Sequence, residues 1–278
     1  GSTPTVSSPV YSQPLAISAT ATLSYFAKDT AGNEGQVKSE SYVIDSTPPV
    51  ITIVSPAAGA ILNTPQITIF GTVNEPVSSV TVNGTAASVN GLTWSLPVTL
   101  NEGVNSFMVK AVDLAGNPAT GSFIVTIDTQ PPQLTVSTLA DGSYTNNATL
   151  NITGTAKDNV GLRDLQINGT VVPVNADGSY SYALALQSGK NTVNVTATDL
   201  AGNPASDGPK ITLDENAPVI TIVTPADNSK TKNPVVQVTG SVDKDAAVEV
   251  KLKDTVQPVI MDGRNFTATI TAEYGSNT

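Results

Sequence analysis

A six-residue string that recurs along the chain constrains the fold more than any other feature. Asp-Leu-Ala-Gly-Asn-Pro occupies residues 113–118 and 199–204, and the weaker copy Asp-Thr-Ala-Gly-Asn-Glu occupies residues 29–34. Each copy is followed by a strand-like run and then by a linker that begins with an acid, and these linker acids are Asp45, Asp128 and Asp214. Two independent markers that share a period of about 85 residues indicate tandem modules.

Within each period the residues alternate between apolar and polar, and no apolar pattern with the 3.6-residue period of a helix is sustained. Turn signals such as Asn83-Gly84 and Asn168-Gly169 separate the runs. About six or seven short strands per period predict an all-β fold of tandem immunoglobulin-like β-sandwiches. One late strand carries an aromatic residue at a fixed place, as Trp94, Tyr180 or Phe266, and we expect these rings to fill the cores.

The motifs also carry a family resemblance. The D-x-A-G-N turn followed by a D-x-x-x-P linker resembles the bacterial Ig-like domains found in tandem arrays, over residues 46–278. Residues 1–45 are similar to the domain at the C-terminus of chitobiase and β-hexosaminidase type enzymes. The matching stretches are Gly1-Ser2-Thr3-Pro4-Thr5, Ser8-Pro9-Val10-Tyr11, Thr22-Leu23-Ser24-Tyr25-Phe26-Ala27 and Ser41-Tyr42-Val43-Ile44-Asp45. Both resemblances imply a β-sandwich in an extracellular or cell-surface protein, and neither implies a reaction.

The period predicts four modules. Residues 46–128 and 129–214 hold complete Ig-like domains, residues 1–45 hold only later strands, and residues 215–278 hold only earlier strands. We interpret the partial modules as the ends of a segment of a longer polypeptide. The alternative is a filament in which the partial modules of neighbouring copies complete each other, since bare sheet edges invite pairing.

The linkers contain prolines, which restrict the backbone. Pro48-Pro49, Pro131-Pro132 and Pro218 each follow a linker acid within a few residues. Proline fixes its own φ near −65° and pushes the preceding residue into extended conformations. We therefore expect short, stiff linkers and an extended rod of modules.

The composition removes several kinds of chemistry. The chain has no Cys and no His, and 13 Lys and Arg stand against 23 Asp and Glu, for a net charge of −10. A thiolate nucleophile, an imidazole base and a zinc site of Cys or His are therefore excluded. An acidic chain is not expected to bind nucleic acid, and no apolar run is long enough for membrane insertion within this segment. Because the carboxylates recur with the repeat, we also expect no catalysis.

The acidic residues are predicted to gather at one end of each module. In an immunoglobulin sandwich the loop between strands B and C, the loop between F and G and the entry of the chain lie at the same end. The predicted sets are Asp45, Glu75 and Asp113, then Asp128, Asp158 and Asp199, and then Asp214 with Asp243. Two like charges 4 Å apart repel by about 4 kcal/mol at an effective dielectric of 20.

A cation would offset this repulsion, and Ca²⁺ is the hypothesis because it takes six to eight oxygen ligands. The resemblance supports the hypothesis, because some tandem bacterial Ig-like adhesins are stiffened by calcium at domain junctions. The alternative is that the aspartates only close turns by accepting backbone N–H groups. No other cofactor is expected.

The sequence therefore predicts a non-catalytic extracellular repeat region, a spacer or stalk of a surface adhesin or filament. Its partners would be other copies, neighbouring domains of the same protein, or a cell-surface or polysaccharide ligand. The alternative is an accessory region of a secreted polysaccharide-acting enzyme that contributes spacing or sugar contact. The candidate sugar-contacting aromatics are Tyr11, Tyr25, Phe26 and Tyr42, for which ordinary packing is the competing interpretation.

Overall fold

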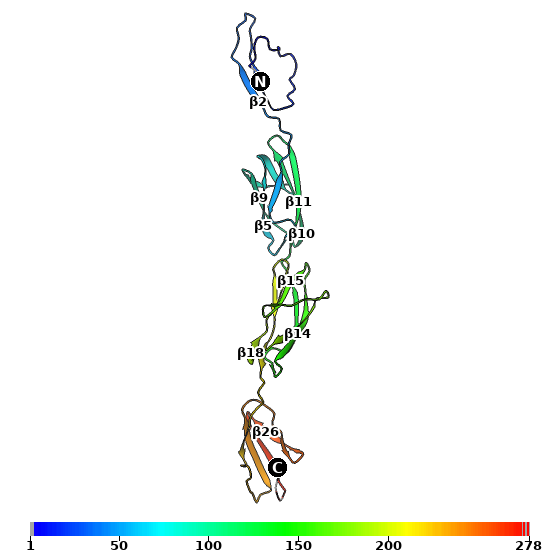
Figure 1. The fold of residues 1–278 in the computed structure, drawn as a ribbon, viewed down its shortest axis with the longest axis vertical. Helices are drawn as coiled ribbons and strands as arrows, with labels where there is room; N and C mark the ends of the chain where they lie inside the picture. The colour runs from blue at the N-terminus through cyan, green and yellow to red at the C-terminus, as the bar shows by residue number, and fades with distance from the viewer. Residues whose placement is uncertain (1–2, 274, 276, 278) are drawn as a thin grey trace. The chain divides into compact units, whose positions relative to one another are not determined.

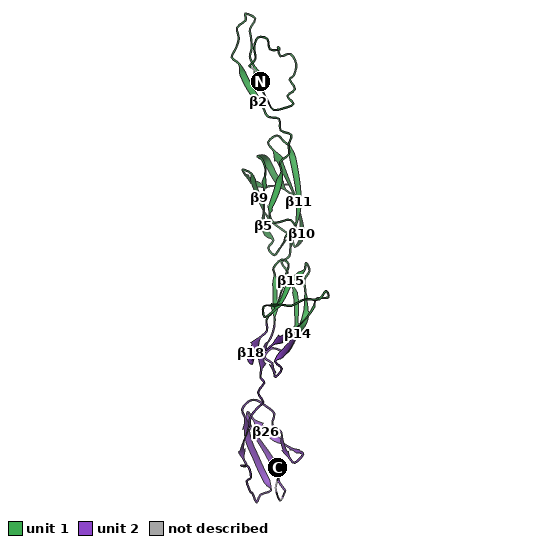
Figure 2. Ribbon diagram, in the orientation of Figure 1, with its two compact units in different colours: residues 1–136, 153–181, 194–207 green, residues 137–152, 182–193, 208–278 purple. Residues whose placement is uncertain are grey.

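The computed structural model describes residues 3–273, 275 and 277, and in this part of the chain every regular element is a β-strand (Figure 1). Gly1 and Ser2, which belong to the N-terminal resemblance, lie outside the described residues. The chain divides into two compact units (Figure 2). Unit 1 comprises Gly1–Val136, Thr153–Ser181 and Asn194–Asp207, and unit 2 comprises Ser137–Ile152, Tyr182–Val193 and Gly208–Thr278.

The first module contains one antiparallel pair, β1 (Ala21–Tyr25) with β2 (Lys38–Tyr42). Between them lies the first copy of the repeated turn, where the Asp29 carboxylate accepts the N–H groups of Ala31 and Asn33. The side chain of Asn33 donates to the same carboxylate at 2.8 Å, and these hydrogen bonds lower the pKa of Asp29. The turn motif thus forms, even in this exposed module, the aspartate-centred turn that its copies form in the second and third repeats.

The second repeat is a sandwich of two sheets. One sheet has the order β3 (Ile51–Ser55), β5 (Gln66–Val73), β9 (Thr93–Thr99), β8 (Ser88–Asn90). The other has the order β4 (Ile61–Leu62), β11 (Pro118–Ile127), β10 (Gly103–Asp113), β6 (Val77–Val82), β7 (Thr85–Ala86). Buried and exposed residues alternate along β10 and β11, so one face of each strand points into the core. Phe107 and Phe123 pair across these strands with their ring centroids 4.9 Å apart.

The third repeat has a similar arrangement of strands, divided among three smaller sheets. One sheet has the order β12 (Gln133–Ser137), β14 (Thr149–Lys157), β17 (Ser179–Ala185). A second sheet, in unit 1, has the order β16 (Thr170–Val171), β15 (Leu162–Ile167), β19 (Val195–Asp199), β20 (Pro204–Asp207). A third sheet, in unit 2, has the order β13 (Tyr144–Thr145), β21 (Lys210–Leu213), β18 (Gly189–Thr192).

The fourth repeat lies in unit 2. Its larger sheet has the order β22 (Ile220–Thr224), β23 (Val235–Val242), β27 (Asn265–Thr271), β26 (Val259–Asp262). A separate pair joins β24 (Val250–Leu252) to β25 (Thr255–Gln257). The expected all-β fold of tandem β-sandwiches is therefore confirmed. The boundaries 1–45, 46–128, 129–214 and 215–278 and the extended rod stay predictions.

The recurring aromatic residues fill the cores, as the sequence predicts, since Trp94, Tyr180 and Phe266 are all 3% exposed or less. Each ring lies against a glycine of the neighbouring strand, and the pairs are Trp94 with Gly71, Tyr180 with Gly154 and Phe266 with Gly240. A Cβ atom at Gly71 would lie 2.6 Å from the indole ring, and one at Gly240 would lie 2.6 Å from the phenyl ring. Because glycine has no Cβ atom, each of these glycines leaves room for the aromatic ring of its repeat.

Candidate cation sites

The repeated D-x-A-G-N turn is held by its own aspartate. The Asp113 Oδ1 atom accepts the N–H groups of Gly116 and Asn117 at 2.6 and 2.8 Å. Burial is the largest single influence and opposes ionisation of Asp113, but the hydrogen bonds from Asn117 and from the Gly116 and Ala115 backbone together outweigh it and lower the pKa. Gly116 has a φ of +98°, which glycine adopts without strain. The third repeat reproduces this arrangement with Asp199, Gly202 and Asn203.

The asparagine of each turn also holds the linker that enters the module. The Asn117 Nδ2 group donates to the Asp45 carbonyl at 3.1 Å and to the Asp113 carboxylate at 2.8 Å. In the third repeat the Asn203 Nδ2 group donates to the Asp128 carbonyl at 2.8 Å and to the Asp199 carboxylate at 2.7 Å. Sequence reasoning assigned no linker contact to this asparagine, although its recurrence at one place in the motif is the signal that could have identified it.

Two of the three predicted carboxylate sets come together in the structure. One carboxylate oxygen from each of Asp45, Glu75 and Asp113 lies within 4.8 Å of the others, and the same is true of Asp128, Asp158 and Asp199. Both clusters lie in unit 1. The turn aspartates Asp113 and Asp199 and the linker aspartate Asp128 are at most 2% exposed, so these members of the clusters are shielded from water. The sets provide oxygen ligands suited to a hard cation such as Ca²⁺.

The cluster in the third repeat leaves negative charge uncompensated. Asp128 is fully buried, and its Oδ1 atom accepts the Gln130 N–H at 3.3 Å and the Asn159 side chain at 3.4 Å. Its Oδ2 atom has no hydrogen-bond partner among the described residues, and neither does the buried Oδ2 atom of Asp158. Burial, together with the nearby charges of Asp158 and Asp199, raises the pKa of Asp128. A buried carboxylate oxygen without a partner is costly, so this site favours a bound cation.

The predicted set in the fourth repeat is built differently. The acid predicted to face Asp214 was Asp243, but its Oδ1 atom accepts the Val219 N–H at 2.7 Å. Asn74 does the same in the second repeat, accepting the Val50 N–H at 2.6 Å. The residue that faces Asp214 is Lys244, whose Nζ atom lies 2.7 and 2.9 Å from the two carboxylate oxygens.

This placement corrects the prediction that Asp243 faces Asp214. The residue equivalent to Glu75 and Asp158 is Lys244, one position after Asp243. Acids stand on both sides of Lys244, at Asp243 and Asp245, and the prediction takes the first of them, although the spacing from the repeated glycine gives Lys244. The bond to Lys244 lowers the pKa of Asp214.

The candidate sugar-contacting aromatics differ in their exposure. Tyr11 is 72% exposed, Tyr25 is 44% exposed and Tyr42 is 43% exposed, whereas Phe26 is partly buried. Tyr25 pairs with Lys38 and Tyr42 pairs with Ala21 in the β1–β2 register. Because directly opposed residues share a face and residues two apart along a strand share a face, both tyrosines lie on one face of this pair of strands.

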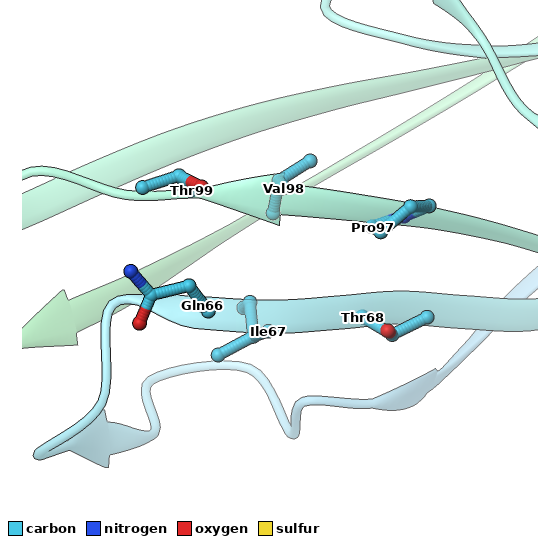
Figure 3. Close-up of a pocket in the computed structure, with 6 residues that line it drawn as sticks. All are labelled: Gln66, Ile67, Thr68, Pro97, Val98 and Thr99. Atoms are coloured by element: carbon cyan, nitrogen blue, oxygen red, sulfur yellow. The ribbon is translucent and has the colours of Figure 1, made fainter.

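A pocket on the second repeat lies over β5 and β9 and is formed by three cross-strand pairs (Figure 3). Its lining residues are Gln66, Ile67, Thr68, Pro97, Val98 and Thr99. Because none of these side chains is titratable, the pocket provides no acid, base or charged ligand for chemistry.

These features together define a chain of tandem immunoglobulin-like β-sandwich modules. The chain belongs to the glucodextranase domain B family, whose sequence model matches residues 49–130 and again residues 132–215. Residues 1–39 match the chitobiase/β-hexosaminidase C-terminal domain, in agreement with the resemblance of the first module. Both family descriptions name one domain of an enzyme, so the modules are accessory domains.

Similar proteins include bacillopeptidase F of Bacillus subtilis, which is 32% identical over 68% of this chain and 14% of its own length. Chitinase A1 of Niallia circulans is 30% identical over 49% of this chain and 20% of its own length. This chain thus spans at most a fifth of either relative.

Among solved structures, the fibronectin(III)-like modules of Clostridium thermocellum CbhA cover 59% of this chain and 94% of their own, with 22% identity and a TM-score of 0.41. A tetra-tandem repeat from the extending region of a large adhesion protein covers 94% of this chain and 72% of its own, with 26% identity and a TM-score of 0.31. Within the described residues no helix has the length and apolar character needed to cross a membrane.

Proposed function

We propose that the chain is a non-catalytic extracellular spacer, an accessory region that holds neighbouring domains of a larger protein apart. One observation carries the proposal, namely that an asparagine side chain that recurs with the repeat donates a hydrogen bond to the linker. Asn117 and Asn203 each bind the carbonyl of a linker aspartate while closing a turn of the following module. Recurring polar groups that fix a linker serve a mechanical role, because they restrict the motion of one module against the next.

The comparisons support this proposal at the level of domain type. The matched families are single domains of enzymes, and the relatives include a peptidase and a chitinase of which this chain spans a small part. We propose that the chain works outside the cell, as the resemblance of its modules to domains of extracellular proteins implies. Its partners would be neighbouring domains or other copies, and an adhesive surface or a filament is the finer form of the same proposal.

We further propose that Ca²⁺ occupies the cluster of Asp128, Asp158 and Asp199. The buried Oδ2 atom of Asp128, without a hydrogen-bond partner among the described residues, supports this proposal most directly. For Asp45, Glu75 and Asp113 the support is the proximity of the carboxylates alone, so Ca²⁺ there stays a prediction. Binding would fix the linker, the turn and the β14–β15 loop to one another.

Calcium is expected to stabilise the third repeat. With a dissociation constant of about 10⁻⁴ to 10⁻³ M, as in extracellular modules, 10 mM Ca²⁺ adds about 1.4 to 2.7 kcal/mol per site. Calorimetry in 10 mM CaCl₂ and in chelator should show a higher melting temperature with calcium. The Asp158→Asn variant should lose most of this shift, while Asp262→Asn, an exposed acid outside the clusters, should keep it. Equal melting temperatures in calcium and chelator would reduce the cluster to turn carboxylates.

A second candidate function is contact with a polysaccharide through the first module. Two observations favour it, the match of residues 1–39 to a domain of chitobiase and β-hexosaminidase, and the exposed tyrosines on one face of β1–β2. The tyrosines are four residues apart along the strands, about 13 Å at 3.3 Å per residue. Aromatic rings on one exposed face can pack against the apolar faces of sugar rings.

Retention on insoluble chitin tests this second function. The unmodified chain should be pulled down with chitin, and the double variant Tyr25→Ala/Tyr42→Ala should lose about tenfold in affinity, if each ring contributes about 0.7 kcal/mol. Tyr144→Ala is the matched control, because Tyr144 is 74% exposed but lies in the third repeat. Retention that is equal in the double variant and the control would remove the sugar-contacting role and leave the spacer role intact.

A further inference from the structure

We propose that Lys244 supplies from within the chain the positive charge that a divalent cation supplies in the third repeat, so that the linker at Asp214 is held without metal. The proposal deepens the proposed function, because it rests on the linker-fixing role of the acidic entrances. It divides the entrances into cation-dependent and cation-independent types.

The recurring core glycine establishes the equivalent positions. Gly71, Gly154 and Gly240 each lie against the core aromatic ring of their own repeat. The fourth residue after the glycine is Glu75 in the second repeat, Asp158 in the third and Lys244 in the fourth. The residue just before it, Asn74 or Asp243, accepts a linker N–H in the second and fourth repeats and returns its own N–H to the same residue's carbonyl. Lys244 therefore stands where the other repeats place an acid.

The contacts of Lys244 are those of a bound cation. Its Nζ atom lies 2.9 Å from Asp214 Oδ1, 2.7 Å from Asp214 Oδ2 and 2.7 Å from the Asn216 carbonyl. The ammonium group has three donors, and these three oxygens, all from the linker, are its acceptors. The side chains of Lys244 and Asp214 are 27% and 34% exposed, so the pair is partly shielded from solvent.

A second positive group is also peculiar to this entrance. The Arg264 guanidinium donates to the Asp243 carbonyl at 2.8 Å and to the Asp245 carboxylate at 3.2 Å. The Arg264 carbonyl accepts the backbone N–H at the end of β23. The carbonyls of Leu92 and Gly178 accept the corresponding N–H groups in the second and third repeats, so these two residues are equivalent to Arg264. Lys244 and Arg264 thus act as counter-ions to Asp214 and Asp245, so these two carboxylates are already neutralised where the acidic clusters of the other repeats are not.

The consequence is a difference in how the linkers respond to their surroundings. When divalent cations are scarce, the clusters in unit 1 lose their counter-ion, whereas the Asp214 linker keeps its ammonium. The chain would then loosen at the cation-dependent entrances and stay fixed at the entrance of the fourth repeat. The state of each linker can be read from its own backbone amides.

Amide hydrogen exchange on the whole chain, in 10 mM CaCl₂ and in chelator, tests the proposal. The reporters at the fourth repeat are the amides of Asn216, Val219 and Asp243, and those at the third are the amides of Gln130, Val160, Gly161, Gly202 and Asn203. In the unmodified chain, calcium should slow exchange at the third repeat and leave the fourth repeat unchanged. Lys244→Gln should speed exchange at Asn216 and Val219 by about two- to fivefold in both solutions.

Two variants at Asp158 test whether a lysine at this position can replace the cation in the third repeat. Asp158→Lys should make exchange at Gln130 independent of calcium while keeping its protection in chelator, and Asp158→Asn should lose both the calcium response and the protection. Lys251→Gln is the matched control for Lys244→Gln, because Lys251 pairs with Glu249 and both side chains are more than half exposed.

The proposal is overturned if calcium slows exchange at Val219 in the unmodified chain, or if Lys244→Gln leaves the Asn216 and Val219 amides unchanged. The two proposals fail in different ways. If calcium changes no amide at all, metal binding in the third repeat is refuted, but a faster exchange in Lys244→Gln still supports the role of the ammonium group. If calcium protects both entrances equally, the clusters bind metal and the distinction based on Lys244 is wrong.

Discussion

Replacing Gly154 with alanine is expected to lower the free energy of unfolding of the third repeat by about 3 kcal/mol, the upper end of the usual cost of overpacking. A Cβ atom at this position would lie 2.0 Å from the Thr135 carbonyl oxygen and 2.7 Å from the Tyr180 hydroxyl. The backbone oxygen cannot move aside without disturbing the β12–β14 pairing. The hydroxyl already donates to that same oxygen at 2.8 Å, so the whole contact would be disrupted.

Chemical denaturation followed by circular dichroism measures this effect, and Gly121→Ala is the matched control. Gly121 also lies in a strand, β11, but a Cβ atom there would meet nothing within 4 Å. The control should be neutral or slightly stabilising, because alanine costs less backbone entropy in a strand than glycine. If Gly154→Ala and Gly121→Ala have the same denaturation midpoint, the close contact with the ring is not what requires glycine.

Truncating Trp94 to alanine is expected to cost the second repeat about 3 to 5 kcal/mol, because a buried aromatic side chain would be replaced by a cavity. Trp94 is 2% exposed and covers Gly71 between the two sheets. The Trp94→Phe variant should lose much less, since Phe266 already fills the equivalent place in the fourth repeat.

Because Trp94 is the one tryptophan of the chain, calorimetry is the suitable measurement for these variants. Phe70→Ala is the control, since Phe70 lies on the same strand as Gly71 but is 41% exposed. A melting temperature for Trp94→Ala no lower than that for Phe70→Ala would contradict the assignment of Trp94 to the core.

Much of the fold could be predicted from the sequence, because a repeat is visible without any knowledge of contacts. The D-x-A-G-N strings at 113–118 and 199–204 set the period, and the alternation within it indicated strands. The carboxylate clusters followed from the same period. Once the modules are taken as immunoglobulin sandwiches, the topology alone brings the linker and two loops to one end. Asp128, Asp158 and Asp199 could therefore be grouped from their places in the repeat.

The roles of Asn203 and Gly154 could not be predicted in the same way. Asn203 was recognised as a turn residue, but its contact with the Asp128 carbonyl joins residues 75 positions apart. Gly154 resembles any other glycine in a strand until the Tyr180 ring is seen above it. Recurrence in the repeat marks both residues, but their contact partners approach from distant parts of the chain, and the local sequence does not identify those partners.

The sequence by itself determined the modular β-sandwich architecture and the gathering of acids at the entrances of the second and third repeats, since both follow from the period and from strand alternation. The tertiary structure decided which side chain faces each linker. In the fourth repeat a difference of one position separates Asp243, which accepts a backbone N–H, from Lys244, which binds Asp214. Successive residues at a strand end point to different sides, so one position changes the charge that meets the linker.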